Sequence, residues 1–335
     1  MLFFLILIML LNTFLLFFYD KLDRLINIYD TPDSLRKLHK GKVPLTGGFL
    51  IFFNLIFFSF IDFILGYKIF FFEDLFNYNR IYFSFIFGLI AFFSLGLLDD
   101  KKSIPANIKL VIQILIIFII LLLDPNLKIE FLRIGFLNKN FTLNEFSLIF
   151  TILCFLLFIN AFNMFDGING QSGLYAALNL LIFYLVSNQT VFLLLIFIMT
   201  IFLYRNIKNK FFLGNSGSYF LSYLISFYFI KFYNVGIIRD SDFIFLAMLT
   251  PGIDMLRLFF LRIYKGSSPF KADRNHLHHI LLRKFSYINS ILILICFMCL
   301  PLIINYIFDK IFLIIFLTLI SYFLLLYNIK IKMKN

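Results

Sequence analysis

Long apolar blocks repeat along the whole chain and are separated by short polar connections. Runs of spanning length fall near 2–18, 46–65, 81–98, 108–123, 145–162, 173–187, 190–204, 217–230, 243–261, 287–305 and 311–327. A bilayer core about 30 Å thick is crossed by roughly 20 helical residues. A helix also satisfies its own backbone polar groups inside lipid. The pattern therefore predicts an all-α, polytopic membrane bundle of eleven spans.

Composition supports this class over a soluble one. The chain is 62% hydrophobic and 14% charged, whereas soluble domains average about 45–50% and about 25%. There is no internal repeat or linker, so residues 1–335 are expected to form one transmembrane domain. The first block lacks a basic start and a small-residue cleavage site, and we interpret it as a retained helix rather than a signal peptide.

The net charge of +12 is explained by topology rather than by nucleic acid. Lys and Arg number 20 in one set of alternate loops, namely 20–45, 99–107, 205–216, 262–286 and the tail 328–335. The opposite loops, 66–80, 124–144, 231–242 and 306–310, hold 8. Basic loops face the cytoplasm, so the N-terminus is expected outside and the C-terminus inside. Loop 124–144 alternates weakly in polarity, which favours a short hairpin.

Asp99 and Asp100 end an apolar run and precede two lysines. Adjacent carboxylates at a membrane boundary repel each other, and ionisable residues there are rare unless they are paired or functional. They suit a hard divalent cation, which takes oxygen ligands, or the role of a base. A solvated helix cap with the lysines as counter-ions is the alternative.

The stretch NAFNMFDGING places Asn160, Asn163, Asp166 and Asn169 at intervals of three. Asp-Gly and Asn-Gly predict a turn after Phe165, with Asp166 at its tip. Carboxylate and amide oxygens there suit a metal or a sugar. A plain turn between spans accounts for the glycines but not for the two Asn residues in the preceding segment.

Two glycine-containing segments lie on the same expected face. Small residues in GNSGS, residues 214–218, let backbone N–H groups approach an anion ahead of a helix, although such a turn equally well caps a helix. The first basic loop carries KLHKGKVPLTGG, with His39 among lysines. Part of that charge is explained by topology alone.

The last basic loop runs from Arg262 to His279 and holds three of the four histidines. Zinc is one interpretation, but no thiol lies nearby and the spacing does not match structural zinc sites. Histidine and arginine together more simply indicate binding of phosphates. A basic loop on anionic lipid explains the Lys and Arg but not the histidines. Upstream, Asp254 and Arg257 lie within a span, where a pair at this spacing can satisfy itself.

The polar clusters thus gather on one expected face, beside lipid. Carboxylates favour a divalent metal, basic groups favour phosphates, and the lipid setting favours a hydrophobic substrate with a polar head. Phosphoryl transfer between a nucleotide diphosphate and a lipid phosphate meets all three demands, because it needs positioning and charge neutralisation above all.

The ordered motifs KLHKGKVPLTGG, LGLLDDKKSI, NAFNMFDGING, FLGNSGSYF and KGSSPFKADRNHLHH resemble the polyprenyl-phosphate N-acetylhexosamine-1-phosphate transferases, part of glycosyltransferase family 4. The resemblance covers about residues 30–285. The PLTGG and KGxSPFxxDRxHxHH wording is closer to the branch that starts O-antigen, common-antigen and teichoic-acid linkage units than to the related phospho-MurNAc-pentapeptide transferases, which remain the alternative.

The resemblance implies a reaction at the cytoplasmic face of a bacterial inner membrane. A UDP-N-acetylhexosamine, with UDP-GlcNAc the expected donor, and undecaprenyl phosphate give a lipid-diphospho-sugar and UMP, with Mg²⁺ or alternatively Mn²⁺. This would be the first membrane step of a cell-envelope polysaccharide. Nucleic acid is not an expected partner, and a homodimer stays open.

The resemblance also implies residue roles. Asp99, Asp100 and Asp166 are the expected catalytic residues, and Asp100, Asp166 and Asn215 the expected metal ligands. The expected substrate-binding residues are His39, Asn160, Asn163, Asn169, Lys265, Arg274, His276, His278 and His279.

Two positions depart from the family pattern. Many relatives read DGxDG and GDxGS where this chain has Asn169 and Asn215. Amide oxygens still suit Mg²⁺, but two negative charges are lost, so weaker metal binding or an inactive paralogue are alternatives. A lipid-linked sugar transporter is the alternative from another class, although transporters place polar residues at mid-membrane.

Overall fold

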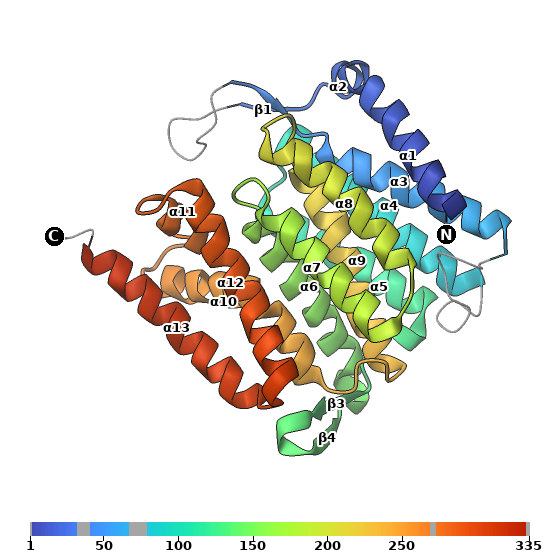
Figure 1. Ribbon diagram of the computed structural model, residues 1–335. Coiled ribbons are helices and arrows are strands. Elements are labelled where there is room, and N and C mark those ends of the chain that lie inside the picture. Colours follow the sequence, from blue (N-terminus) through green and yellow to red (C-terminus); the bar gives the residue numbers. More distant parts are fainter. Residues whose placement is uncertain (1, 32–40, 67–78, 269–272, 333–335) are drawn as a thin grey trace.

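The computed structural model describes residues 2–31, 41–66, 79–268 and 273–332, which form a bundle of helices with two short hairpins (Figure 1). The helices are α1 Leu2–Phe17, α2 Tyr19–Ile26, α3 Gly47–Ile64, α4 Asn79–Lys102, α5 Ala106–Leu123, α6 Ser147–Phe165, α7 Gln171–Ser187, α8 Val191–Ile207, α9 Gly214–Asn234, α10 Ser241–Tyr264, α11 Leu277–Leu282, α12 Tyr287–Phe308 and α13 Ile311–Lys332. Each of the eleven apolar runs lies in a helix, which confirms the all-α class.

Helix length supports fewer membrane spans than the apolar runs predict. Among the described residues, seven helices are long and apolar enough to cross a bilayer, or eight if α1 and α2, bent by 62°, form one span. Two of the remaining expected spans, α7 and α8, have 17 residues each. Eleven spans and the orientation of the termini therefore stay predictions.

Helix α9 is the centre of the bundle. Almost all of its residues from Gly214 to Phe232 are buried, and it packs most extensively against α4, with α6, α3 and α7 around it (Figure 1). Because of its serines, α9 is less apolar than the lipid-facing helices. It can contain these polar residues because protein surrounds it. The apolar runs predicted α9 as one of eleven spans but did not predict its central position.

Two glycines on α4 allow the close approach of α9. A Cβ on Gly88 would lie 2.2 Å from the Tyr223 ring, and one on Gly96 would lie 2.3 Å from the carbonyl oxygen of Asn215. Small residues at helix contacts are typical of membrane bundles, where tight packing replaces the hydrophobic effect between helices. The contact at Gly96 sets the start of α9 directly beside the end of α4.

The two hairpins lie at opposite ends of the bundle in Figure 1. Strands β3 Phe131–Ile134 and β4 Lys139–Thr142 pair antiparallel, which confirms the hairpin predicted in loop 124–144. Strands β1 Tyr29–Asp30 and β2 Val43–Pro44 pair near α2. The PLTGG segment then joins the loop before α9, because Gly47 and Gly48 donate to the carbonyls of Phe212 and Leu213.

Candidate active site

The carboxylate of Asp100, in the last turn of α4, caps the start of α9. Its Oδ1 accepts from the backbone N–H of Asn215 at 2.8 Å, and its Oδ2 from that of Ser216 at 3.0 Å. Gly214 precedes them with φ +75°, a backbone conformation that glycine adopts without strain. The GNSGS segment does bind an anion, as its composition indicated, and among the described residues that anion is the chain's own Asp100.

Asp99 has different partners from its neighbour. Its Oδ1 accepts from the backbone N–H of Ile104 at 2.9 Å, and its Oδ2 forms a 3.0 Å ion pair with Lys109 of α5. Its side chain is buried. The lysines that follow it, Lys101 and Lys102, are exposed, so a lysine ten residues on is the counter-ion. The two carboxylates of the pair therefore have separate environments.

Asn163 connects α6 with the start of α9. Its Nδ2 donates to Oδ1 of Asn215 at 2.9 Å and to the hydroxyl of Ser218 at 2.7 Å. Asn215 is thus held on both sides, since its backbone N–H binds Asp100 and its side chain binds Asn163. Asn160, one turn earlier, donates to Gln113 of α5 at 2.9 Å instead. Asn163 belongs to the cluster with Asp100, and Asn160 joins two helices.

The turn after α6 forms as the Asp-Gly and Asn-Gly pairs predict. Helix α6 ends at Phe165, and Asp166 is its C-terminal cap. The hydroxyl of Ser172 donates to Asp166, and burial raises the pKa of the Asp166 carboxyl to about 6, with the Ser172 bond acting against the rise. A raised pKa means that the folded surroundings disfavour its charge, which a bound cation would offset.

The rest of this turn is tied to the loop between α8 and α9. Asn169 donates to Oδ1 of Asn209 at 2.6 Å, and the next backbone N–H, that of Gly170, donates to Asn206 at 2.7 Å. The hydroxyl of Tyr287 donates to the carbonyl of Asn169. The contacts of Asn169 thus hold the turn in place, and nothing in its surroundings links it directly to Asp100.

The histidine loop meets this turn through His278. A Cβ on Gly167 would lie 1.9 Å from Nε2 of His278, so the imidazole rests directly against the residue after Asp166. His278 is 1% exposed, and its Nδ1 has no hydrogen-bond partner among the residues that the structure describes. Burial, together with nearby His279, lowers the pKa of His278 well below its usual value. A neutral imidazole here is therefore favoured.

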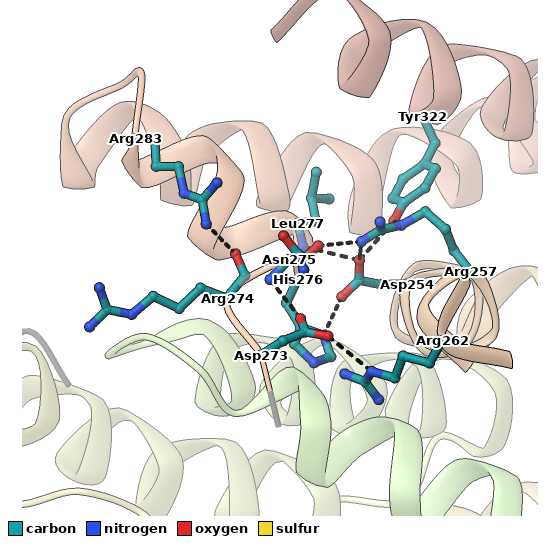
Figure 2. A network of polar contacts seen from close by, with 10 residues as sticks. All are labelled: Asp254, Arg257, Arg262, Asp273, Arg274, Asn275, His276, Leu277, Arg283 and Tyr322. Atoms are coloured by element: carbon teal, nitrogen blue, oxygen red, sulfur yellow. Dashed lines mark hydrogen bonds and ion pairs between the residues drawn. The ribbon is translucent and has the colours of Figure 1, made fainter. Parts of the chain in front are cut away.

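His276 is held by Asp254 of α10, at an Nδ1 to Oδ2 distance of 2.8 Å (Figure 2). Its ring lies parallel to that of His278, 5.5 Å away with 6° between the planes, and His279 follows at 4.3 Å from His278. The three histidines therefore form one group, placed against Gly167 on one side and against α10 on the other.

The other expected residues of this loop have varied places. The guanidinium of Arg274 extends away from Asp254 (Figure 2), and its Nε is buried without a hydrogen-bond partner in the described part of the chain. Lys265 is exposed at the end of α10. His39 lies outside the described residues. Among the described residues of this loop, Arg274 thus has a buried donor that no other group uses.

A divalent cation fits the donor types present. No group of three or more His, Cys, Asp or Glu residues suited to a metal occurs among the described residues. Mg²⁺, however, is usually held by one or two carboxylates, with waters and substrate phosphates completing its shell. Asp100 is joined through Asn215 to Asn163, one helical turn before Asp166. These contacts connect Asp100 to the amide oxygen of Asn215 and to the segment that leads to Asp166, and carboxylate and amide oxygens are donor types that Mg²⁺ accepts.

Several contacts of the site were not predicted. No role was predicted for Lys109. Asp254 was placed within a span and paired with Arg257, but its bond to His276 was not predicted. Asn206 and Tyr322 were not considered. An Asn at the end of a span and a Tyr in a terminal apolar helix give no signal in one sequence, because their role depends on residues far along the chain.

The fold and the site define a class, namely a polytopic helical membrane protein (Figure 1) whose acidic, amide and imidazole groups meet where α4 and α6 end and α9 begins. Residues 82–233 match the sequence profile of glycosyl transferase family 4. This match supports the family resemblance that the ordered motifs indicate.

The chain is also similar in sequence to curated proteins. The chain is 28% identical over 295 residues to an undecaprenyl-phosphate alpha-N-acetylglucosaminyl 1-phosphate transferase of Escherichia coli O157:H7, covering 83% of this chain and 76% of the relative. The namesake from Yersinia pestis has the same identity and coverage. The one from Thermotoga maritima is 28% identical over 269 residues, covering 80% of this chain and 77% of the relative.

Proposed function

We propose that this protein transfers an N-acetylhexosamine-1-phosphate group from a UDP-sugar, with UDP-GlcNAc as the expected donor, to undecaprenyl phosphate. The observation that carries the proposal is the meeting of motifs far apart in the sequence. Gly167, beside Asp166, contacts His278, while Asn163 reaches Asn215, which binds Asp100. A site with carboxylates at one side and histidines at the other suits a diphosphate that carries a cation.

The residues of the site would have different chemical roles. His278, the Nε–H of Arg274 and, when its ring carries both protons, His276 are suited to the phosphates of the donor, since each can then donate to a phosphate oxygen. Asp100 and Asp166, with Asn215, would hold Mg²⁺, which would supply charge neutralisation for the departure of UMP. Asp99 is the remaining carboxylate of the pair, and its ion pair with Lys109 would orient it toward the acceptor phosphate.

The setting fits a lipid acceptor. Helices around the site are apolar and of spanning length, so a polyprenyl chain can stay in the bilayer while its phosphate reaches the ends of α4 and α6. We propose that this end of the bundle faces the cytoplasm of a bacterial inner membrane, where the nucleotide donor is made. The product would then begin a cell-envelope polysaccharide.

The test uses the purified full-length protein with UDP-GlcNAc, undecaprenyl phosphate and Mg²⁺, and measures UMP release together with a lipid-linked product. We expect Asp100→Asn to lower turnover by at least about 100-fold, because a transition-state electrostatic contact typically contributes this much. Asp309→Asn is the control, since Asp309 is exposed at φ +47°, where Asn is equally suited. Normal turnover by Asp100→Asn would remove Asp100 from the mechanism.

A panel of donors separates the alternatives. UMP release with UDP-MurNAc-pentapeptide but not with UDP-GlcNAc would favour the phospho-MurNAc-pentapeptide reaction. Movement of a lipid-linked sugar across vesicles without UMP release would favour a transporter. Omission of Mg²⁺, with Mn²⁺ as a second ion, tests the cofactor.

A further inference from the structure

Asp254 is a buried carboxylate at the centre of a polar network within the apolar bundle (Figure 2). Its Oδ1 accepts from Arg257 at 2.8 Å, from the backbone N–H of Leu277 at 3.0 Å and from the hydroxyl of Tyr322 at 2.7 Å. Its Oδ2 contacts Nδ1 of His276. A buried charge is tolerated only when it is paired and hydrogen-bonded, and Asp254 meets both conditions.

This network fixes three consecutive residues of the histidine loop. Arg257 donates to the carbonyl of Asn275 at 2.6 Å, while Asp254 binds the side chain of His276 and the N–H of Leu277. His276 is thus restrained through its side chain and through the peptide groups on both sides. Rotation of its ring would break a charge-assisted bond, which is stronger than a neutral one.

The same contact sets the tautomer of His276. An ionised carboxylate accepts hydrogen bonds and donates none, so the proton that joins His276 to Asp254 lies on Nδ1. The other ring nitrogen, Nε2, is then free to face a ligand, as in sites where a carboxylate orients a histidine.

Tyr322 completes the network from α13, far along the chain from the histidines and outside the matched residues 82–233. Its hydroxyl donates to Asp254 and accepts from Nε of Arg257 at 2.9 Å. One hydroxyl therefore fixes both the anion and the cation that hold the loop. Its ring is 1% exposed and packs edge-on against Phe297 at 6.2 Å, contacts that a phenylalanine would keep.

We propose that Tyr322 is a positioning residue for the transfer reaction, acting through Asp254 and Arg257 to hold His276 in the orientation that binds the donor phosphates. This rests on the proposed function. The last helix is then part of the active-site apparatus, although it supplies no group that touches the substrate.

The first measurement compares steady-state kinetics of Tyr322→Phe with those of the wild-type protein. We expect kcat/KM for UDP-GlcNAc to fall about 10-fold, the lower end of effects seen when a group that orients a ligand is removed, with thermal stability close to that of the wild type. Tyr327→Phe is the matched control, because Tyr327 lies on the same helix and is 64% exposed. A Tyr322→Phe enzyme with unchanged kcat/KM would overturn the proposal.

A double-mutant cycle separates positioning from general support of the fold. If Tyr322 acts through His276, Tyr322→Phe should cause no further loss in a His276→Ala background, because the effects of coupled residues do not add. An equal loss in both backgrounds would mean that Tyr322 acts elsewhere, and would contradict the proposal.

Chemical modification tests the network without any substrate. His276 is 8% exposed, and we expect its reaction with diethyl pyrocarbonate, followed by mass spectrometry, to be several-fold faster in Tyr322→Phe than in wild type or Tyr327→Phe. Equal reactivity in all three would refute the network. Faster reaction in a protein that is inactive with every sugar donor would instead support the network and reject the proposed function.

Discussion

Asp99 and Asp100 are adjacent in the sequence but have unequal environments, and this difference suggests different tasks. Asp100 receives two backbone N–H bonds at the start of α9, whereas Asp99 is paired with Lys109. The positive end of a helix and an ammonium group each stabilise a carboxylate. Each carboxylate therefore has its own hydrogen-bond donors, which a bare pair beside lipid would lack.

Asn215 stands at a position where many members of the resembled family carry an aspartate. Its side-chain oxygen accepts from Asn163, and an aspartate would accept the same bond while adding a negative charge. We predict that Asn215→Asp lowers the Mg²⁺ concentration for half-maximal activity by several-fold, because carboxylates bind this ion more strongly than amides do. Titration of UMP release against Mg²⁺ gives the value.

Asn163→Asp serves as the contrasting variant for this experiment. It removes the donor that holds Asn215 and Ser218 and should lower activity at every Mg²⁺ concentration. An unchanged Mg²⁺ requirement in Asn215→Asp would show that this side chain is not a metal ligand.

At the scale of elements, an ionisable side chain complements the helix dipole at each end of α9. Its first turn receives the carboxylate of Asp100, and near its last turn Lys231 forms a buried 2.9 Å ion pair with Asp124. An anion at the start and a cation at the end both complement the helix dipole. The helix that carries the site loop is thereby fixed at both termini.

The turn after α6 and the short helix α11 meet at Gly167, where a side chain has no room. We predict that Gly167→Ala lowers kcat/KM by at least about 10-fold, because a Cβ 1.9 Å from His278 must displace the histidine loop. Gly252→Ala in α10 is the control, since a Cβ there meets nothing within 4 Å and alanine is the better helix former. Wild-type kinetics in Gly167→Ala would mean that the two segments are not in contact during the reaction.

Local sequence patterns were sufficient to predict the helices and turns. Contacts between residues far apart in the chain could not be predicted from one sequence. Asp-Gly and Asn-Gly marked the end of α6, because turn chemistry depends on adjacent residues. The separation of Asp99 from Asp100 depends on Lys109, and the role of Asp254 depends on His276 and Tyr322. These pairings arise only when helices pack, so the sequence predicted which residues are unusual but not which of them touch.

For the whole molecule, the site and the β3–β4 hairpin lie at opposite ends of the bundle (Figure 1). If the basic loops face the cytoplasm, the hairpin faces outward and the site inward. Each end carries an exposed lysine that suits a label, Lys139 in β4 and Lys210 before α9. The orientation of the protein can therefore be measured with a matched pair of variants.

We predict that Lys139→Cys reacts with a membrane-impermeant maleimide on intact cells, and that Lys210→Cys reacts only after the membrane is opened. The native thiols Cys154, Cys296 and Cys299 are free and are first replaced by alanine. One lysine is lost from each variant, so total charge is matched. The reverse pattern would place the site outside, away from the cytoplasmic nucleotide donor, and would reject the proposed reaction together with the orientation.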